Sequence, residues 1–246
     1  MDGLLDGALL GVMDRDDLAE IDRRFYTTVR EPVDGEQSTY TDEKHIRQGL
    51  ANWERAVVTE TFPPGARVLV TAAGAGREVL GLLDAGFDPV GYEPHDDLVE
   101  AGRAVLAADG LDADRLRRSP RDRFPDHTGP CDAVVIGWCS FTLVPGRHRR
   151  NELLGAARAL LEPGAPLLVS FFLRRDDKLY FSVVYRTAST LRRLRRAEPA
   201  EFGDALGPNF VHCFGPGEVE AELAAAGFSC ERWAAKPYPH ALARAV

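Results

Sequence analysis

Cysteine is scarce in this chain, basic residues are in the minority, and no long apolar run is present. The four cysteines lack any C-x-x-C spacing, which argues against a zinc site or a redox pair. Isolated thiols are typical of a reducing compartment, so we expect a cytoplasmic protein that uses no metal. No apolar run approaches the ~18 residues that cross a membrane. The apolar stretch from Ala8 to Met13 ends at Asp14 and has no basic flank, so no signal peptide is predicted.

The charge balance is negative: 38 acidic against 30 basic residues give a net charge of −8. Phosphate contacts need a basic surface, so this balance argues against a general nucleic-acid binder. One basic cluster, Arg192-Arg193-Leu194-Arg195-Arg196, is interpreted either as a solvated helix face or as an attractor of an acidic substrate or RNA. With 246 residues, 45% of them hydrophobic, the chain can form one large domain, as a monomer or a homodimer.

What the sequence does contain is a regular alternation of strand and helix patterns. Helical patterns fall near 76–85, 95–108 and 147–161, and apolar strand runs fall near 67–71, 89–93, 115–119, 132–137 and 166–172. The runs show little polar alternation, as is typical of strands covered on both faces. The chain is therefore expected to be an α/β protein, a mostly parallel sheet with helices on both faces.

Two segments fall outside this alternation. Residues 1–64 are expected to form an N-terminal helical cap, with helices over 14–29 and 41–62, the second capped by Thr41 and ended by Pro63-Pro64-Gly65. Residues 65–246 would then be the core. Within it, residues 174–209 are longer than a crossover needs and contain a predicted helix over 180–196 followed by a loop. We expect this insertion after the fifth strand to form a lid or a substrate wall.

The segment from Arg67 to Arg103 is the most informative. Its first strand stops at a turn of small residues, Ala72 to Gly76, and its second strand ends in Glu93. A tight turn lets a ligand approach the backbone, a helix start presents free N–H groups, and an acid accepts hydrogen bonds from ribose. The dinucleotide pattern G-x-G-x-x-G fails, because Val79 stands at its third glycine, and the turn lacks the lysine of a P-loop.

The same segment resembles motif I of the class I S-adenosylmethionine-dependent methyltransferases. Gly74 and Gly76 match the last two glycines of the family's G-x-G-x-G turn, and Glu93 matches its acid. Ala72 replaces the first glycine, which a negative φ would allow. Val70 replaces an acid often found in the family, and offers no polar contact to the methionine ammonium.

Later segments extend the resemblance from residue 67 to residue 246. Residues 131–138 are similar to the family's fourth strand, residues 153–172 to its helix, Pro-Gly turn and fifth strand, and residues 224–228 to the start of its terminal hairpin. The resemblance implies the class I methyltransferase fold: a seven-stranded sheet in the order 3-2-1-4-5-7-6, with the seventh strand antiparallel.

The resemblance also implies S-adenosyl-L-methionine as cofactor, with S-adenosyl-L-homocysteine as product, bound at the carboxyl ends of the strands. The turn would meet the methionine carboxylate, Glu93 both ribose hydroxyls, and Asp122 the adenine amino group. The implied cofactor residues are Ala72, Ala73, Gly74, Gly76, Glu93, Pro94, Asp122, Trp138 and Ser140. Simpler roles stay open: Glu93 as a helix cap, Trp138 as a core aromatic and Asp122 as a solvated loop acid.

Methyl transfer needs a base only if the acceptor is protonated. His45 and His212 are the candidates, although such histidines are more often structural. Tyr26 and Tyr40 are expected to close the substrate pocket. We therefore predict methyl transfer to a small molecule, in secondary metabolism. The alternatives are an RNA or protein methyltransferase, a non-catalytic S-adenosylmethionine-binding module, and a nicotinamide-dependent oxidoreductase.

Overall fold

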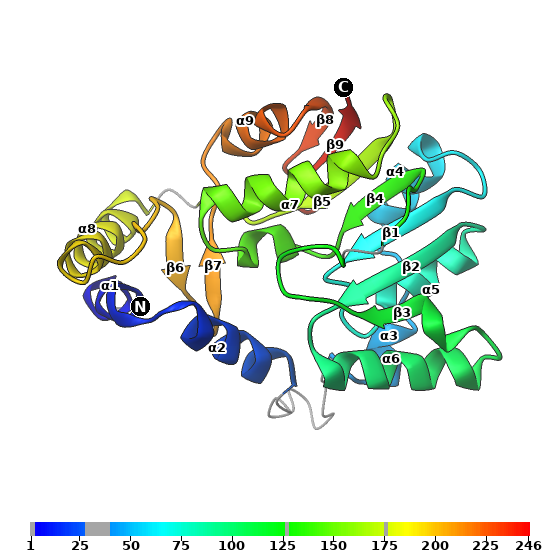
Figure 1. Ribbon diagram of the computed structural model, residues 1–246, viewed down its shortest axis with the longest axis horizontal. Helices are drawn as coiled ribbons and strands as arrows, with labels where there is room; N and C mark the ends of the chain where they lie inside the picture. Colours follow the sequence, from blue (N-terminus) through cyan, green and yellow to red (C-terminus); the bar gives the residue numbers. More distant parts are fainter. Residues whose placement is uncertain (1–2, 28–39, 126–127, 175–176) are drawn as a thin grey trace.

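The computed structural model describes residues 3–27, 40–125, 128–174 and 177–246. A central sheet carries helices on both faces, and a smaller unit lies at one end of the molecule (Figure 1). The strand order of the sheet is β3-β2-β1-β4-β5-β9-β8, and β9 runs antiparallel to both of its neighbours. Counted along the core, this order is 3-2-1-4-5-7-6, so the predicted fold class is confirmed. The strands are β1 (Arg67–Thr71), β2 (Asp88–Glu93), β3 (Leu116–Arg118), β4 (Ala133–Ile136), β5 (Pro166–Ser170), β8 (Phe228–Ala234) and β9 (His240–Ala245).

Each face of the sheet buries its own apolar cluster. Val68 and Val70 of β1 belong to one cluster and Leu69 belongs to the other, because successive side chains of a strand point to opposite faces. The first cluster is covered by α3 (Glu43–Ile46), α4 (Asn52–Thr61), α5 (Arg77–Asp84) and α6 (Asp96–Ala108). The second is covered by α7 (Arg147–Ala159) and α9 (Glu218–Ala225). Single 3₁₀ turns lie at Ala113–Arg115 and Ser140–Leu143.

The predicted helix over 41–62 is wrong in its middle, where α3 ends and α4 has not begun. Gly49 adopts a left-handed φ of +61°. A Cβ on Gly81 would lie 2.2 Å from the backbone nitrogen of Leu50, so α5 packs directly against this bend. Close packing therefore outweighs helical propensity here. The cap is Asp42 rather than Thr41, since its carboxylate accepts the Lys44 N–H at 2.9 Å.

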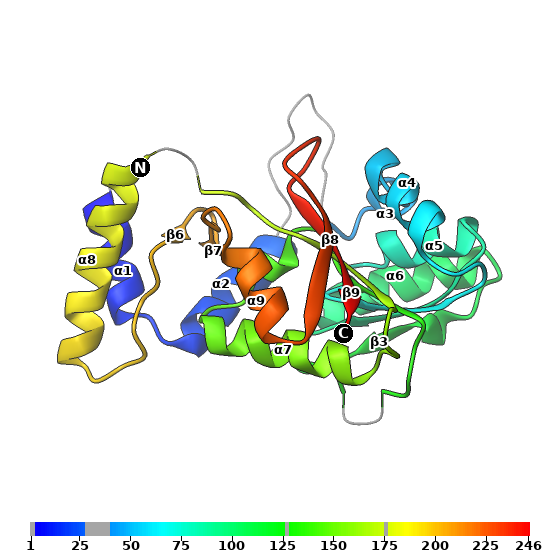
Figure 2. The ribbon, with the colours of Figure 1, turned by 90° about the horizontal axis from the view of Figure 1, so that it is seen from above.

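The smaller unit contains α1 (Gly3–Val12), α2 (Arg15–Thr27), α8 (Lys178–Leu194) and the hairpin of β6 (Asp204–Leu206) and β7 (Phe210–His212). Figure 2 shows α1 and α8 side by side at the end of the molecule. Small residues allow this approach: a Cβ on Gly7 would lie 2.8 Å from the Cβ of Thr187. No helix is predicted from the sequence for residues 3–12, and the part of the insertion that contains β6 is predicted as a loop. Both elements are stabilised by distant partners, which local patterns do not reveal.

The basic cluster at the end of α8 is partly structural. Arg192 donates to the Leu10 carbonyl oxygen at 2.8 Å, and Arg195 donates to the carbonyl oxygen of Val12. These carbonyls lie at the C-terminal end of α1, where cations are stabilising. Two of the four arginines thus hold α1 on α8. Among the described residues, no helix is both long enough and apolar enough to span a bilayer.

Candidate functional site

A cavity of about 460 Å³ opens at the carboxyl ends of β1 to β4. Its size falls within the roughly 300–1,000 Å³ that is typical of small-molecule sites. The cavity brings together most of the residues predicted from the sequence. Those that line it are Tyr26, Tyr40, His45, Ala72, Ala73, Gly74, Glu93, Pro94, Asp122, Trp138 and Ser140. His212 and Gly76 are not among the lining residues.

The turn after β1 is tighter than we expected. Ala72 has a φ of +51°, so the expectation of a negative φ is wrong. The segments that follow β1 and β4 approach closely here: a Cβ on Gly137 would be 2.4 Å from the Ala72 carbonyl oxygen. Gly74 is also left-handed, with a φ of +55°. Gly76, with a φ of +85°, begins α5 behind the cavity wall, and Ala75 lines the cavity in its place.

Ala72→Gly should stabilise the protein by about 1 kcal/mol. An L-residue in the left-handed region is strained by roughly 1–2 kcal/mol, and glycine relieves this at a smaller entropic cost. Urea unfolding of the two proteins measures the difference. Ala75→Gly is the control: Ala75 is absent from the residues with positive φ, so this change should destabilise or be neutral. Equal changes in the free energy of unfolding for the two substitutions would show that the backbone at Ala72 is not strained.

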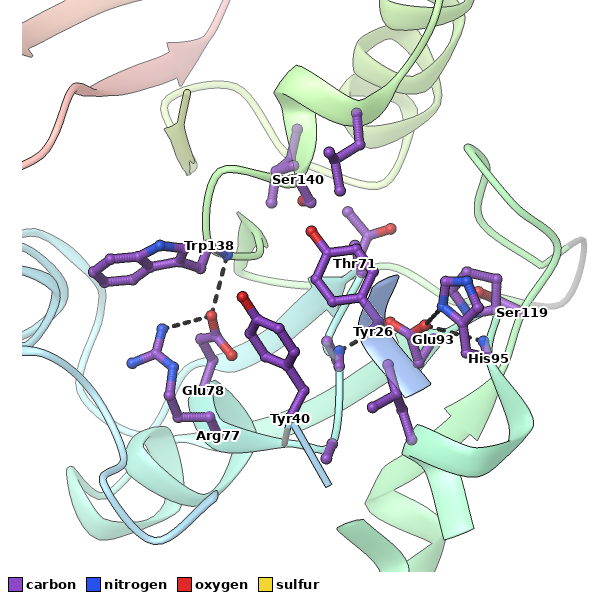
Figure 3. Close-up of a pocket in the computed structure, with 18 of the residues that line it drawn as sticks. Tyr26, Tyr40, Thr71, Arg77, Glu78, Glu93, His95, Ser119, Trp138 and Ser140 are labelled. Atoms are coloured by element: carbon purple, nitrogen blue, oxygen red, sulfur yellow. Dashed lines mark hydrogen bonds and ion pairs between the residues drawn. The ribbon is translucent and has the colours of Figure 1, made fainter. Parts of the chain in front are cut away.

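Glu93 lies at the end of β2, and its side chain is buried at the cavity wall (Figure 3). One oxygen accepts the Gly74 N–H at 2.9 Å. The other accepts the His95 N–H at 3.0 Å and lies 2.5 Å from His95 Nδ1. These contacts use three of about four lone-pair sites of a carboxylate, which leaves one for a ligand. Glu93 therefore both fixes the glycine turn and remains available as an acceptor.

The loop after β3 forms a second wall that combines acids and arginines. The Asp122 side chain is only 9% exposed and lies 3.4 Å from Arg15 and 3.7 Å from Arg121. Burial raises the pKa of Asp122, although the two arginines oppose this. Asp122 is therefore not a solvated loop acid. Sequence reasoning missed Asp22 of α2, which is buried here, pairs with Arg121 and accepts the Asn209 side-chain N–H at 2.8 Å.

The opposite wall carries a buried ionic network that sequence reasoning also missed. Arg77 donates to both oxygens of Glu54 at 2.8 and 3.0 Å, and to Glu78 at 2.7 Å. It donates further to the Gly49 carbonyl oxygen at 2.6 Å, which fixes the bend between α3 and α4. All three charged side chains are buried. The only signal in the sequence was the pair of charged residues, Arg77 and Glu78, at the start of an apolar helix. An acid at that position is also expected from the helix dipole alone.

Trp138 links this network to the cavity. Its backbone N–H donates to Glu78 at 3.1 Å, and its ring lies 4.9 Å from the Arg77 guanidinium carbon (Figure 3). Tyr238, from the loop between β8 and β9, meets the Trp138 ring edge-on at 4.5 Å between centroids. Ser140 is turned back, because its hydroxyl donates to the Gly137 carbonyl oxygen at 2.7 Å. Trp138 is thus a wall of the cavity rather than a core aromatic.

Aromatic rings from the N-terminal segment form the remaining wall. Tyr26 and Tyr40 meet edge-on with centroids 4.9 Å apart, and Tyr40 meets His45 at 5.3 Å. Burial, assisted by the Arg77 charge, lowers the pKa of His45, so this imidazole is neutral at pH 7 and can accept a proton. Burial raises the pKa of Tyr26 well above its usual value, so its phenol keeps its proton.

His212 lies elsewhere, on β7. It is buried, and its Nδ1 is 2.8 Å from Asp204. Glu201 completes a group whose three ligand atoms lie within 4.8 Å of one another, a spacing that could hold a metal ion. The buried Arg150 guanidinium, however, already donates to Glu201 at 2.9 Å. We interpret this group as an anchor for the insertion, and His212 does not reach the cavity.

The insertion itself contributes little to the cavity. None of the described residues of the segment 174–209 lines it. The insertion contacts the cavity wall only indirectly among the described residues: the Asn209 side chain donates to Asp22, which lines the cavity. The N-terminal segment, in contrast, lines the cavity with Tyr26, Tyr40 and His45.

No protein-family model and no curated protein sequence matches this chain. Several solved structures share its fold. A methyltransferase from Methanosarcina mazei, described as S-adenosylmethionine-dependent, superposes with a TM-score of 0.62 at 16% identity and covers 80% of this chain and 99% of its own. An amino pentose methyltransferase of calicheamicin biosynthesis from Micromonospora echinaspora gives 0.60 at 17% identity, covering 88% and 100%. The CcbJ methyltransferase from Streptomyces caelestis gives 0.58 at 15% identity, covering 98% and 99%. The sheet order and these superpositions agree: the chain has the fold of the class I S-adenosylmethionine-dependent methyltransferases.

Proposed function

We propose that this protein is an enzyme that transfers the methyl group of S-adenosylmethionine to a small-molecule acceptor and releases S-adenosylhomocysteine. One observation carries the proposal. The buried Glu93 carboxylate lines a cavity of suitable size, beside a left-handed turn, at the strand ends where open α/β sheets bind ligands. The solved structures with this fold support it, since those named above are methyltransferases and one has S-adenosylmethionine bound.

The residues present fit this cofactor. When bound, S-adenosylmethionine supplies an electrophilic methyl group on a sulfonium. Glu93 would accept from the ribose, Pro94 and Asp122 would flank the adenine, and the turn at Gly74 would face the amino-acid moiety. Trp138, Tyr238 and Tyr40 would exclude water from the reacting atoms. Holding two reactants in line can supply several kcal/mol of the barrier reduction. His45, neutral at pH 7, would remove a proton from an acceptor that carries one.

For the acceptor we propose a small metabolite rather than a polymer, with secondary metabolism as the setting. The net charge of −8 and the enclosed aromatic wall favour it. One of the similar structures is an amino pentose methyltransferase. The N-terminal segment would select the acceptor, and the insertion would support α2 from behind. An RNA or protein acceptor is less well supported, because the basic cluster of residues 192–196 was the sequence feature that favoured it. Two arginines of that cluster, Arg192 and Arg195, instead cap α1.

A nicotinamide-dependent reaction is also disfavoured. Val79 stands where the dinucleotide pattern has its third glycine, and its side chain is fully buried. The close packing of α5 on β2 is allowed by a glycine of the strand instead, since a Cβ on Gly91 would lie 2.6 Å from Val79. A non-catalytic module would bind the cofactor but transfer nothing.

Calorimetry with S-adenosylmethionine, S-adenosylhomocysteine and NAD separates these functions. We expect micromolar binding of both sulfur ligands and no binding of NAD. Methyl-labelled S-adenosylmethionine, incubated with small-metabolite fractions and separately with RNA, then tests transfer. Label in a small metabolite is the expected result. NAD binding without either sulfur ligand would reject the proposal, label in RNA would favour the polymer alternative, and binding without any transfer would favour the module.

A further inference from the structure

The buried cluster of Glu54, Arg77 and Glu78 beside the cavity contains two carboxylates and one guanidinium. Glu54 and Glu78 share a single guanidinium, that of Arg77, and all three side chains are buried. The neighbouring His45 is neutral at pH 7, because burial and the Arg77 charge lower its pKa. An uncompensated buried charge is costly unless a cation pairs with it.

Only one of the two carboxylates faces the cavity. Glu78 lines it, whereas Glu54 lies behind, with both oxygens on Arg77. The two hydrogen bonds to Glu78, from Arg77 at 2.7 Å and from the Trp138 backbone N–H at 3.1 Å, end on the same oxygen (Figure 3). Among the described residues, none donates to its second oxygen. A rigidly held carboxylate therefore offers a free acceptor oxygen to a ligand.

Its place in the fold suggests which part of the ligand it meets. Glu78 lies in the first turn of α5, immediately after the glycine turn, and is tied to the end of β4 through Trp138. Glu93 stands at the end of β2. A ligand whose ribose lies at Glu93 and whose chain crosses the turn would end near Glu78. Val70 cannot supply a charge there, since it is completely buried in the apolar cluster under α5.

We propose that Glu78 is the residue that receives the ammonium group of the ligand's amino-acid moiety, replacing an acid at the end of β1. This inference rests on the proposed function, because it assumes a ligand that carries both a ribose and an amino-acid tail. Arg77 and Glu54 act through Glu78 and are positioning residues, because they fix its carboxylate. One guanidinium balances only one of the two carboxylates, so the cluster keeps one negative charge. An ammonium at this point pairs that charge and donates to the free oxygen.

The test compares S-adenosylhomocysteine with the analogue that lacks only its α-amino group. Calorimetry of the wild-type protein should give about 10- to 100-fold tighter binding of S-adenosylhomocysteine, as expected for one charge-assisted hydrogen bond. In Glu78→Gln this preference should fall to about threefold or less, with the analogue bound nearly as well as before. Asp84→Asn is the matched control: it removes an exposed carboxylate from the same helix, α5, at a position that does not line the cavity, so the preference should persist.

The outcomes separate this inference from the proposed function. If the wild-type protein binds neither ligand, the proposed function fails and the inference with it. If it binds S-adenosylhomocysteine without preference over the analogue, or if Glu78→Gln keeps the full preference, the function stands and the inference is overturned. Thermal melting checks folding. If Glu78→Gln does not melt cooperatively, Glu78→Asp decides: it keeps the charge but retracts the oxygen, so an unchanged preference would overturn the inference.

Discussion

Glu93→Ala should weaken the binding of S-adenosylhomocysteine by at least about 100-fold. One hydrogen bond from a ribose hydroxyl to a buried carboxylate is worth roughly 1.5–3 kcal/mol, and a factor of 100 corresponds to about 2.7 kcal/mol. The loss is expected to be larger than for any other single residue of the cavity. Glu93 also holds the Gly74 N–H, so its removal releases the turn that the rest of the ligand crosses.

This double role calls for a measurement that isolates the ribose. Methylthioadenosine and its 2′-deoxy form differ by one hydroxyl, and both lack the amino-acid tail. Wild-type protein should prefer the hydroxylated ligand by about 10-fold, the value expected for one hydrogen bond to a charged group. In Glu93→Ala the preference should vanish, whereas a merely loosened turn would weaken both ligands equally and preserve it.

Asp96→Ala is the matched control. Asp96 is an acid three residues further on, but its side chain is 70% exposed at the start of α6. Its removal should change the affinity by less than about twofold, because exposed charges are screened. If Glu93→Ala melts normally and still binds S-adenosylhomocysteine within threefold of the wild type, the ribose role is wrong and Glu93 is only a cap.

The parts of the fold that could be predicted from the sequence are those determined by residues close together in the chain. Strand runs such as Val68 to Val70 are apolar, and glycines close the helices: Gly86 and Gly164 adopt the positive φ that helix ends and tight turns demand. Since the carboxyl ends of parallel strands meet at one edge, residues far apart in sequence could be placed in one cavity. Eleven of the thirteen predicted site residues line it.

What could not be predicted depends on partners distant in sequence. His45 and His212 were equal candidates, yet α3 carries His45 to the cavity while Asp204 engages His212 on the hairpin. The left-handed Ala72 lies where the segment after β4 approaches the turn at Gly137, and no local pattern encodes this approach. The Arg77 network joins residues 23 positions apart around a bend that packing creates. Such interactions are decided by tertiary context, where intrinsic propensities are weak guides.

Arg77→Met should lower the free energy of unfolding by about 3–5 kcal/mol at pH 7.5. Removing one partner from a buried ionic network leaves uncompensated charge in a medium that solvates it poorly, and this is far worse than losing an exposed pair. Here two buried carboxylates, Glu54 and Glu78, lose the guanidinium that they share. The Gly49 carbonyl also loses its donor, so the bend that presents His45 should loosen. Urea unfolding measures the effect.

The pH dependence of this loss identifies its cause. Burial already raises the pKa of Glu54, against the opposing pull of Arg77. Without the arginine, the folded-state pKa of Glu54 should rise further above its unfolded value. A group with a raised folded-state pKa binds more protons when folded, so its contribution is favourable at low pH and is lost as the pH rises. The deficit of Arg77→Met relative to wild type should therefore shrink from pH 7.5 to pH 5.

Arg47→Met supplies the matched comparison, because Arg47 also bridges two carboxylates, Glu43 at 2.7 Å and Asp109 at 2.6 and 2.9 Å. Its side chain is 39% exposed, against 10% for Arg77. Water can solvate the carboxylates that Arg47 leaves behind, so its removal should cost less than about 1 kcal/mol and show no recovery in acid. Equal losses for the two substitutions would mean that the Arg77 network is no more than a surface pair. A large loss that persists at pH 5 would instead trace the effect to packing around α5 and not to charge.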